Sequence, residues 1–190
     1  MSKEFIKRVL SSIILLPLVL YFIIKGSYYL IFFTIICFLV ALYEWNKMVK
    51  KINYKLLGVI FLIFSFYSFY ESTINYLWSF VFLVCVSTDI GGYVFGKFFK
   101  GPKLTKISPN KTYSGMIGGY FLSLILTSLY FGWLNHEISM YWFISIILIS
   151  TVSQVGDIII SYFKRLSKIK NTGKIIPGHG GLLDRIDGMI

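Results

Sequence analysis

The segment YWFISIILISTVSQVGDIIISYFKR, residues 141–165, decides the class of fold. Its apolar part, Tyr141–Phe163, is long enough to cross the hydrocarbon core of a bilayer, which needs about 20 helical residues. The run holds one acidic residue, Asp157, about two helical turns before the cations Lys164 and Arg165. A long apolar run that ends in cations is typical of a helix leaving a membrane, so we expect an integral membrane protein.

The composition of the whole chain supports the same class. Of its 190 residues, 56% are hydrophobic and only 14% are charged, whereas soluble globular proteins carry about 25% charged residues. These values exclude a disordered chain and a water-soluble globule. Cys37 and Cys85 both lie in apolar runs without metal-site spacing, so we interpret them as small core hydrophobes.

Five further apolar runs precede residue 141. They are Val9–Ile24, Tyr28–Val49, Leu56–Phe69, Ile74–Phe95 and Tyr113–Leu134. The shortest of them, Leu56–Phe69, is also compatible with a re-entrant segment, and no cleavage site follows the first run. The predicted fold is an all-α, polytopic membrane helical bundle with about six transmembrane helices. We expect a single domain over residues 1–190, in which residues 81–115 and 153–190 are the candidate functional segments.

The distribution of cations orients this bundle. Loops rich in lysine alternate with nearly neutral loops, and 18 of the 19 Lys and Arg residues fall on the side of the N-terminus, Lys25 being the exception. The positive-inside rule therefore predicts a cytoplasmic N-terminus. Topology and attraction to anionic lipid also explain most of the net charge of +11, so nucleic acid is not an expected partner.

The aspartates are few, and none lies in an ordinary surface loop. They are Asp89, Asp157, Asp184 and Asp187. Asp89 and Asp157 fall within apolar runs, where a charge costs several kcal/mol unless it has a partner. Gly91 and Gly92 beside Asp89 allow a backbone or a ligand to approach closely. Polar stripes in membrane helices also serve as interhelical hydrogen-bonding contacts, but two buried aspartates favour a functional cavity.

Two patterns predict that acidic residues meet at one cytoplasmic site. On a helix Ser153, Asp157 and Ser161 share one face, and Asp184 and Asp187 share another at a spacing of three. Carboxylates from separate segments would make an oxygen-rich site that suits Mg²⁺. The alternative for the second pair is a surface contact between Asp184 and Arg185, and the pattern alone leaves both open.

Two basic loops, Gly96–Thr112 and Lys164–Gly181, are rich in Gly, Pro and Lys. Lysine binds phosphate as a point charge, arginine offers a bidentate fork, and exposed N–H groups in Gly/Pro turns can cradle an anion. Topology alone is the alternative explanation for the lysines. His179, between glycines, is a candidate base, ligand or hydrogen-bond donor to phosphate, or an ordinary polar loop residue.

The C-terminal residues resemble a known signature. Lys164-Arg165, Lys170-Asn171, Pro177-Gly178-His179-Gly180-Gly181 and Asp184-Arg185-Ile186-Asp187 stand at the spacing found in the phosphatidate cytidylyltransferase (CDP-diacylglycerol synthase) family. Asp89-Ile90-Gly91, Tyr93, Ser108-Pro109 and Lys111-Thr112 are similar to a second block of that family, and Arg8, Pro17 and Glu44-Trp45 to its opening helices. The family usually has Asp at position 171 and often Glu or Gln at position 114, where this chain has Asn171 and Ser114. Its members are typically longer, with a further membrane helix after the final Asp.

The resemblance implies an enzyme that makes CDP-diacylglycerol and pyrophosphate from CTP and phosphatidic acid, with Mg²⁺. It implies that Asp157 and Asp184 are the metal-site carboxylates. Asp89 and Asp187 are our own further candidates for this site, because they are the two remaining aspartates. The expected catalytic residues are Asp157, Asp184, Lys164, Arg165 and Arg185. The expected substrate and phosphate contacts are Ser108, Lys111, Thr112, Ser161, Lys170, His179, Gly180 and Gly181.

The expected partners are CTP, phosphatidic acid and the lipid bilayer, with a homodimer as an open alternative to a monomer. The expected location is the inner (cytoplasmic) membrane, with several spans and the active site facing the cytoplasm. Two other functions stay open at this point: a CTP-dependent lipid kinase, and a membrane transporter that also uses buried aspartates and glycine-rich helices.

Overall fold

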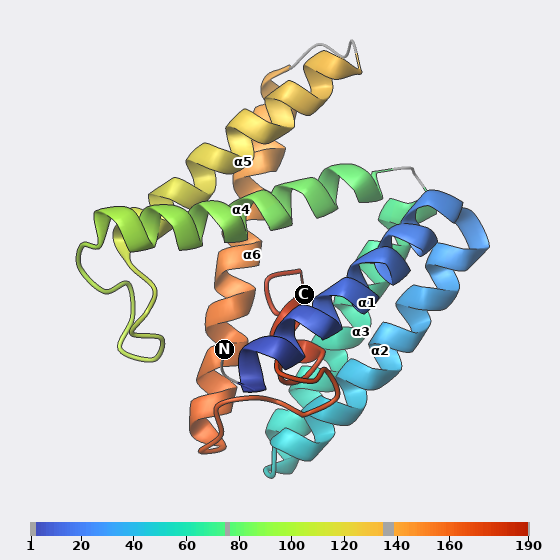
Figure 1. Cartoon of the computed structure of the whole chain (residues 1–190), viewed down its shortest axis with the longest axis vertical. Coiled ribbons are helices and arrows are strands. Elements are labelled where there is room, and N and C mark those ends of the chain that lie inside the picture. Colours follow the sequence, from blue (N-terminus) through green and yellow to red (C-terminus); the bar gives the residue numbers. More distant parts are fainter. Residues whose placement is uncertain (1–2, 75–76, 135–138, 190) are drawn as a thin grey trace. The chain divides into compact units, whose positions relative to one another are not determined.

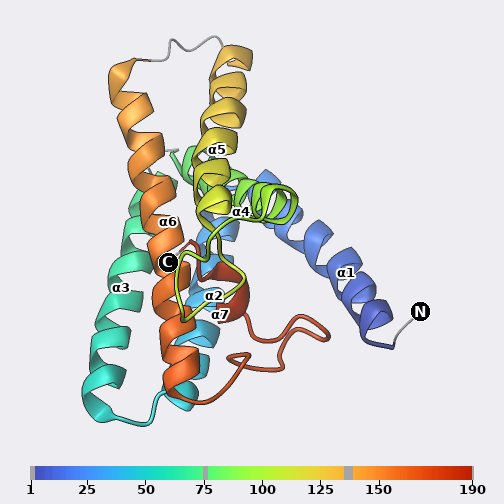
Figure 2. The same ribbon diagram turned by 90° about the vertical axis from the view of Figure 1, so that its left-hand side faces the viewer.

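The computed structural model describes residues 3–74, 77–134 and 139–189, and its regular structure there is helical (Figure 1 and Figure 2). The helices are α1 (Lys3–Lys25), α2 (Ser27–Met48), α3 (Ile52–Ile74), α4 (Trp78–Phe99), α5 (Tyr113–Trp133), α6 (Met140–Leu166) and α7 (Leu183–Ile186). Two isolated β-bridges, Lys103 with Thr112 and Ile176 with Gly180, tighten the loops after α4 and α6. The predicted all-α fold is confirmed.

Five helices, α2 to α6, are long and apolar enough to cross a membrane. Among them is α3, which extends beyond the short run Leu56–Phe69 on both sides, so the segment does not need to be re-entrant. In α1 the described apolar stretch is shorter, Val9–Phe22. The prediction of about six spans is therefore close, and the cytoplasmic N-terminus stays a prediction.

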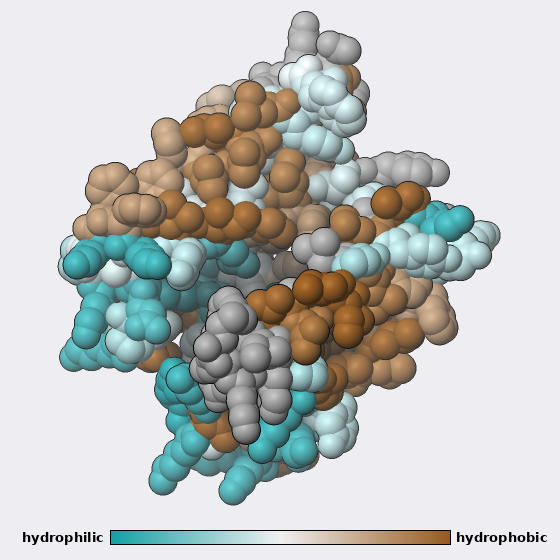
Figure 3. Space-filling model, viewed as in Figure 1, coloured by the Kyte–Doolittle hydropathy of each residue, from teal (hydrophilic) through white to brown (hydrophobic). Residues whose placement is uncertain are grey.

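The outer faces of these helices suit contact with lipid. In α3 the side chains of Leu56, Ile60, Phe64 and Tyr67 recur every three or four residues and are 58% to 68% exposed. Such a face buries apolar surface only when hydrocarbon covers it. Figure 3 shows hydrophobic residues over α4 and α5, and hydrophilic residues gathered over the loop that follows α4.

The chain divides into two compact units, and each is described by itself. The first unit is Met1–Tyr76 with Phe163–Ile186, and the second is Leu77–Tyr162 with Asp187–Ile190. The helix α6 therefore contributes to the second unit up to Tyr162 and to the first from Phe163 onward. Residues 81–115 fall in the second unit, whereas residues 153–190 are divided between the two units.

In the first unit, Trp45 of α2 is the central packing residue and is only 2% exposed. Its ring meets the ring of Phe163 edge-on at 4.9 Å between centroids, and its Nε1 donates a hydrogen bond to Lys55 O at 3.2 Å. A Cβ at Gly58 would overlap the indole ring, so α3 can approach α2 this closely only with glycine at that position.

In the second unit, aromatic rings join α4, α5 and α6. Phe80 and Phe131 stack at 5.5 Å, and the ring of Trp142 meets them edge-on at 5.1 and 4.9 Å. Val84 and Ile146 complete this core and are fully buried. The three helices are thus fixed to one another by contacts that exclude lipid.

Helices α4 and α5 cross at glycines. A Cβ at Gly115 would lie 2.6 Å from Gly92 O, and a Cβ at Gly91 would overlap the backbone of Gly118. Small residues at such a crossing let two membrane helices pack backbone against backbone. The expectation that the glycines after Asp89 admit another backbone is confirmed, and that close crossing holds Asp89 beside the start of α5.

Candidate functional site

The second unit contains an ion pair between Lys111 Nζ and Asp157 Oδ2. Asp157 lies on α6 and Lys111 precedes α5, so the pair joins two segments that are far apart in sequence. The two side chains are 29% and 23% exposed. Ser161 Oγ, one helical turn after Asp157, donates a long hydrogen bond of 3.4 Å to Asp157 Oδ1. A partly exposed carboxylate with so few partners can exchange them for a ligand.

The loop after α4 places Lys111 by backbone hydrogen bonds. Lys111 N donates to Ser108 O at 3.0 Å, and Lys111 O accepts from Leu104 N at 2.7 Å. The next residue, Thr112, caps α5 because its Oγ1 accepts a hydrogen bond of 3.1 Å from Gly115 N. Lys111 is therefore held on both sides, and only its long side chain is free to move.

A second carboxylate belongs to this group. Asp89 of α4 lies close enough to Asp157 and Lys111 for both charges to act on it. A Cβ built on Gly188 would lie 3.2 Å from Asp89 Oδ1 and 3.1 Å from Ser153 Oγ, so the C-terminal segment borders the group. We call Asp89, Lys111, Asp157 and Ser161 the Asp157 cluster.

Hydrogen bonds among the helices support the Asp157 cluster. Thr88 Oγ1 donates to Ser150 Oγ at 2.9 Å, between α4 and α6, and both residues are buried. Tyr120 Oη and Thr151 Oγ1 lie 2.9 Å apart, between α5 and α6. Buried polar contacts of this kind fix the rotation of membrane helices, so they set the direction in which Asp89 and Asp157 project.

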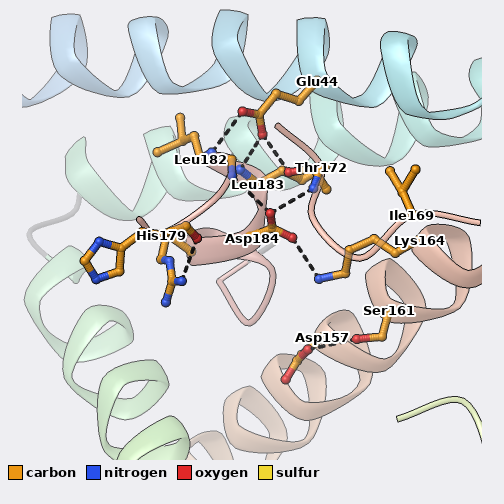
Figure 4. Close-up of polar contacts among 12 residues, drawn as sticks. Glu44, Asp157, Ser161, Lys164, Ile169, Thr172, His179, Leu182, Leu183 and Asp184 are labelled. Atoms are coloured by element: carbon orange, nitrogen blue, oxygen red, sulfur yellow. Dashed lines mark hydrogen bonds and ion pairs between the residues drawn. The ribbon is translucent and has the colours of Figure 1, made fainter. Parts of the chain in front are cut away.

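The first unit contains a different arrangement around Asp184 (Figure 4). Asp184 Oδ1 accepts from Lys164 Nζ at 3.0 Å, and Oδ2 accepts from Thr172 N at 2.8 Å and from Gly181 N at 3.0 Å. The side chains of Asp184 and Lys164 are only 8% and 12% exposed. The structure therefore pairs Asp184 with Lys164, and not with Arg185 as a surface pair would require.

On the other side of the same loop lies Glu44 of α2 (Figure 4). Its Oε1 accepts from Leu182 N at 3.0 Å, and its Oε2 accepts from Leu183 N and from Thr172 Oγ1, both at 2.9 Å. Glu44 is 1% exposed. We call Glu44, Lys164, Thr172 and Asp184 the carboxylate clip, because two carboxylates hold one loop between them.

The loop held by the clip folds into a tight turn. Ile176 N donates to Gly180 O at 2.9 Å, and Gly178 and Gly180 have positive φ angles of 76° and 95°, which favour glycine. His179 Nδ1 lies 2.8 Å from Ser11 Oγ of α1, and His179 O accepts from Arg185 Nη2 at 2.7 Å. His179 is thus a loop residue whose ring and carbonyl both have partners within the protein.

The structure brings together only part of the predicted site residues. Lys111, Asp89, Asp157 and Ser161 meet in the second unit, whereas Lys164 and Asp184 meet in the first. The guanidinium of Arg165 is exposed and donates a hydrogen bond of 3.5 Å to Ile169 O, and Lys170 is also exposed. Ser108 and Thr112 order the backbone around Lys111. The catalytic and metal roles of all these residues stay predictions.

The sequence analysis missed Glu44 and Thr172 as site residues. Glu44 does carry a signal, because it is an acidic residue inside the second apolar run, in the same situation as Asp89 and Asp157. Thr172 carries none, since a threonine in a polar loop is ordinary. Its importance arises from partners 12 and 128 positions away.

The Asp157 cluster fits a magnesium ion by the chemistry of its donors. No group of three or more His, Cys, Asp and Glu side chains suited to a metal occurs among residues 3–74, 77–134 and 139–189. Mg²⁺ is usually held by only one or two carboxylates, with waters and substrate phosphates completing its shell. Asp89 and Asp157 supply two. Asp184 uses three of about four lone-pair directions of a carboxylate, which leaves one for a cation.

Known proteins are similar to this chain over most of its length. Residues 55–190 match the cytidylyltransferase family. A phosphatidate cytidylyltransferase of Rickettsia felis is 37% identical over 200 residues, which cover 96% of this chain and 86% of that protein. The phosphatidate cytidylyltransferase of Rickettsia typhi is 38% identical with the same coverage.

A third relative comes from another bacterium. The phosphatidate cytidylyltransferase of Staphylococcus aureus strain COL is 42% identical over 141 residues, which cover 71% of this chain and 54% of that protein. The resemblance of the C-terminal segment to such enzymes is thereby confirmed over most of the chain. The match over residues 55–190 and the similarity to these relatives show that this chain belongs to the cytidylyltransferase family.

Proposed function

We propose that this chain transfers the CMP group of CTP to phosphatidic acid and so makes CDP-diacylglycerol and pyrophosphate. In this reaction a phosphate oxygen of phosphatidic acid attacks the α-phosphorus of CTP. The bond from that phosphorus to the bridging oxygen of pyrophosphate breaks, and pyrophosphate leaves. Such reactions need mainly positioning and neutralisation of charge, which lysines and carboxylate-bound cations provide.

The observation that carries the proposal is the Lys111–Asp157 ion pair beside Asp89. In this group a cation that can bind phosphate is held by a carboxylate that can bind metal. When a nucleotide arrives, Lys111 can transfer from Asp157 to a phosphate oxygen and leave the carboxylate available. Because the backbone of Lys111 is fixed by its loop, this exchange requires only a change of side-chain rotamer.

We propose that Asp157 holds Mg²⁺, with Asp89 as its neighbour in the same unit. A bound Mg²⁺ would neutralise phosphate charge and orient the reacting groups. The resemblance assigns the same role to Asp184, with Asp187 as a further candidate, and both assignments remain part of the proposal. Ser161 would orient Asp157 through its hydrogen bond.

The clip and its loop are proposed to bind nucleotide. The backbone of Gly180 and Gly181, the ring of His179, and the cations Lys164, Lys170, Arg165 and Arg185 are the candidate phosphate contacts of this segment. The tight turn supports this role because hydrogen bonds within the protein hold it at both ends. A preorganised loop loses little conformational freedom on binding.

We propose that the protein works in the bacterial inner membrane, with these segments on the cytoplasmic side. The lysine distribution supports the orientation, and the apolar helices support the membrane setting. Phosphatidic acid would then reach the protein from within the bilayer and CTP from the cytoplasm. Ser108 and Thr112, which order the loop around Lys111, would border the lipid phosphate.

The test is product analysis with the purified protein, phosphatidic acid and CTP labelled at either the α- or the γ-phosphate, with and without Mg²⁺. The proposal predicts that α-label enters the lipid, that γ-label appears in pyrophosphate, and that both need Mg²⁺. A lipid kinase would instead move γ-label to lipid, and a transporter would leave CTP intact. Either result would contradict the proposed function.

A further inference from the structure

The most constrained acidic residue outside the predicted site is Glu44. Its carboxylate is buried at 1% exposure, and it accepts three hydrogen bonds from a segment 128 to 139 positions away in the chain. Burying a carboxylate in an apolar helix is costly, and three donors are what such a group needs. A buried carboxylate with these three partners therefore has a structural role beyond packing.

The donors belong to the two ends of one loop. Thr172 Oγ1 lies at the start of the loop, whereas Leu182 N and Leu183 N follow its end. Glu44 therefore ties both ends to α2. Asp184 of α7 also joins the two ends, because its Oδ2 accepts from Thr172 N and from Gly181 N. Thr172 donates to both carboxylates and is the residue that couples them.

Two glycines allow the contact. A Cβ at Gly173 would lie 2.5 Å from Glu44 Oε1, and a Cβ at Gly181 would lie 2.6 Å from the same atom. The loop backbone thus lies directly against the carboxylate at both ends, and any side chain would push it away. Gly173 and Gly181 thus pack directly on the carboxylate of Glu44, and this packing determines the shape of the loop that carries His179.

We propose that Glu44 is a positioning residue for the reaction: it holds the Pro177–Gly181 loop in its working shape without touching substrate. This inference rests on the proposed function, since the loop is the candidate nucleotide contact. Because Glu44 is buried, it acts through Thr172 and the N–H groups of Leu182 and Leu183. Removing its negative charge lowers turnover by loosening both ends of the loop.

The first variant is Glu44→Gln, which keeps the shape but places an NH₂ donor where an acceptor is required. We expect kcat per folded molecule to fall about thirtyfold, because hydrogen bonds to a charged acceptor are lost. The KM for phosphatidic acid should stay unchanged. Trypsin should cut faster at the exposed Lys168, Lys170 and Lys174, because cleavage follows the open population of a segment.

The second variant set acts on the partner. Thr172→Val removes the hydroxyl, and we expect kcat to fall about fivefold; Thr172→Ser keeps the hydroxyl and should restore kcat to within about twofold of wild type. In a double variant the losses of Glu44→Gln and Thr172→Val should not multiply, because both break one contact. Asn46→Ala is the matched control, since Asn46 is exposed on α2 and bonds only within its helix, to Leu42 O.

The outcomes separate this inference from the proposed function. If wild-type protein does not turn over CTP, the proposed function fails, and the trypsin comparison still decides whether Glu44 holds the loop. If wild type is active but Glu44→Gln matches it in kcat per folded molecule and in trypsin pattern, the inference is wrong. If Glu44→Gln does not fold, the same measurements on Thr172→Val decide whether the contact positions the loop. A double variant then combines Thr172→Val with a Glu44 substitution that does fold. If its two losses of kcat multiply, the proposed coupling of Thr172 to Glu44 is wrong.

Discussion

The Asp157 cluster and the carboxylate clip use the same residue types in opposite ways. Asp157 is 29% exposed and has one ion pair and one long hydrogen bond, whereas Asp184 is 8% exposed and accepts from three donors. Both carboxylates face a lysine. Only the first is free to change partners at small cost, because its pair is partly solvated and has few additional contacts.

This difference predicts that the two carboxylates have different roles in this protein. A carboxylate with open coordination can take up a cation and release its lysine to a phosphate. A carboxylate with its oxygens occupied stabilises the backbone around it, because unpaired N–H groups in a buried place are costly. The comparison predicts two kinds of defect. Variants of the Asp157 cluster should lose turnover alone, whereas variants of the carboxylate clip should lose both turnover and the order of the loop.

The largest effect is expected for Asp184→Asn. This variant removes the negative charge that pairs with Lys164 in a largely buried place, which costs about 3–5 kcal/mol, and it removes a proposed metal carboxylate. We expect turnover of CTP to fall about a thousandfold, together with a lower melting temperature and faster trypsin cleavage at Lys168, Lys170 and Lys174. A normal trypsin pattern would contradict the role of Asp184 in the clip.

The next effect is expected for Asp157→Asn, which keeps the size of the side chain. We expect turnover to fall about a hundredfold, because a group that stabilises charge in the transition state is lost. The trypsin pattern of the loop should match wild type. The control for both aspartates is Glu71→Gln on α3, which lies outside both groups and should retain wild-type turnover. If Asp157→Asn loosened the loop, the two regions would not be distinct in function.

A smaller effect is expected at Lys111. Lys111→Met removes a charged phosphate contact worth about 1.5–3 kcal/mol, so turnover should fall about thirtyfold. Lys111→Arg keeps the charge and should stay within about fivefold of wild type. Steady-state rates at several CTP concentrations distinguish a defect in KM from one in kcat. Equal activity of the Met variant and wild type would remove Lys111 from the proposed exchange.

The smallest effect is expected for Ser161→Ala. The hydrogen bond to Asp157 is 3.4 Å long and therefore weak, so its loss should lower turnover only about twofold. The same rate assay measures this, and Ser161→Thr, which keeps the hydroxyl, is the comparison. A loss above tenfold would mean that Ser161 contacts a substrate or a metal, and the description of the Asp157 cluster would need to change.

Most of the fold could be predicted from the sequence because hydropathy and charge are local properties. Among the described helices that can cross a membrane, α2, α4, α5 and α6 match predicted runs, and the glycines after Asp89 do admit a neighbouring helix. The doubtful run Leu56–Phe69 was the exception. The polar residues on both sides of this run made the helix look shorter in the sequence than it is. A helix continues through Asn, Tyr, Glu and Ser when its ends lie at the membrane surface.

The candidate site was less predictable because its contacts are not local. The aspartates stood out as charges in apolar runs, but nothing in the loop itself indicates that Thr172 donates to Glu44. The partner of Asp184 was also not predictable, because Lys164 and Arg185 are both plausible by spacing and only the folded loop selects Lys164. Glu44 could have been found by applying the rule for buried charges to every acidic residue.

The most direct test of the account is binding of a divalent cation to the Asp157 cluster. Mn²⁺, as a probe for Mg²⁺, can be titrated into the purified protein with a non-hydrolysable CTP analogue and followed by electron paramagnetic resonance. The account predicts that Asp157→Asn lowers the affinity for Mn²⁺ at least about tenfold, whereas Ser161→Ala changes it little. Equal Mn²⁺ affinity of Asp157→Asn and wild type would contradict the central claim.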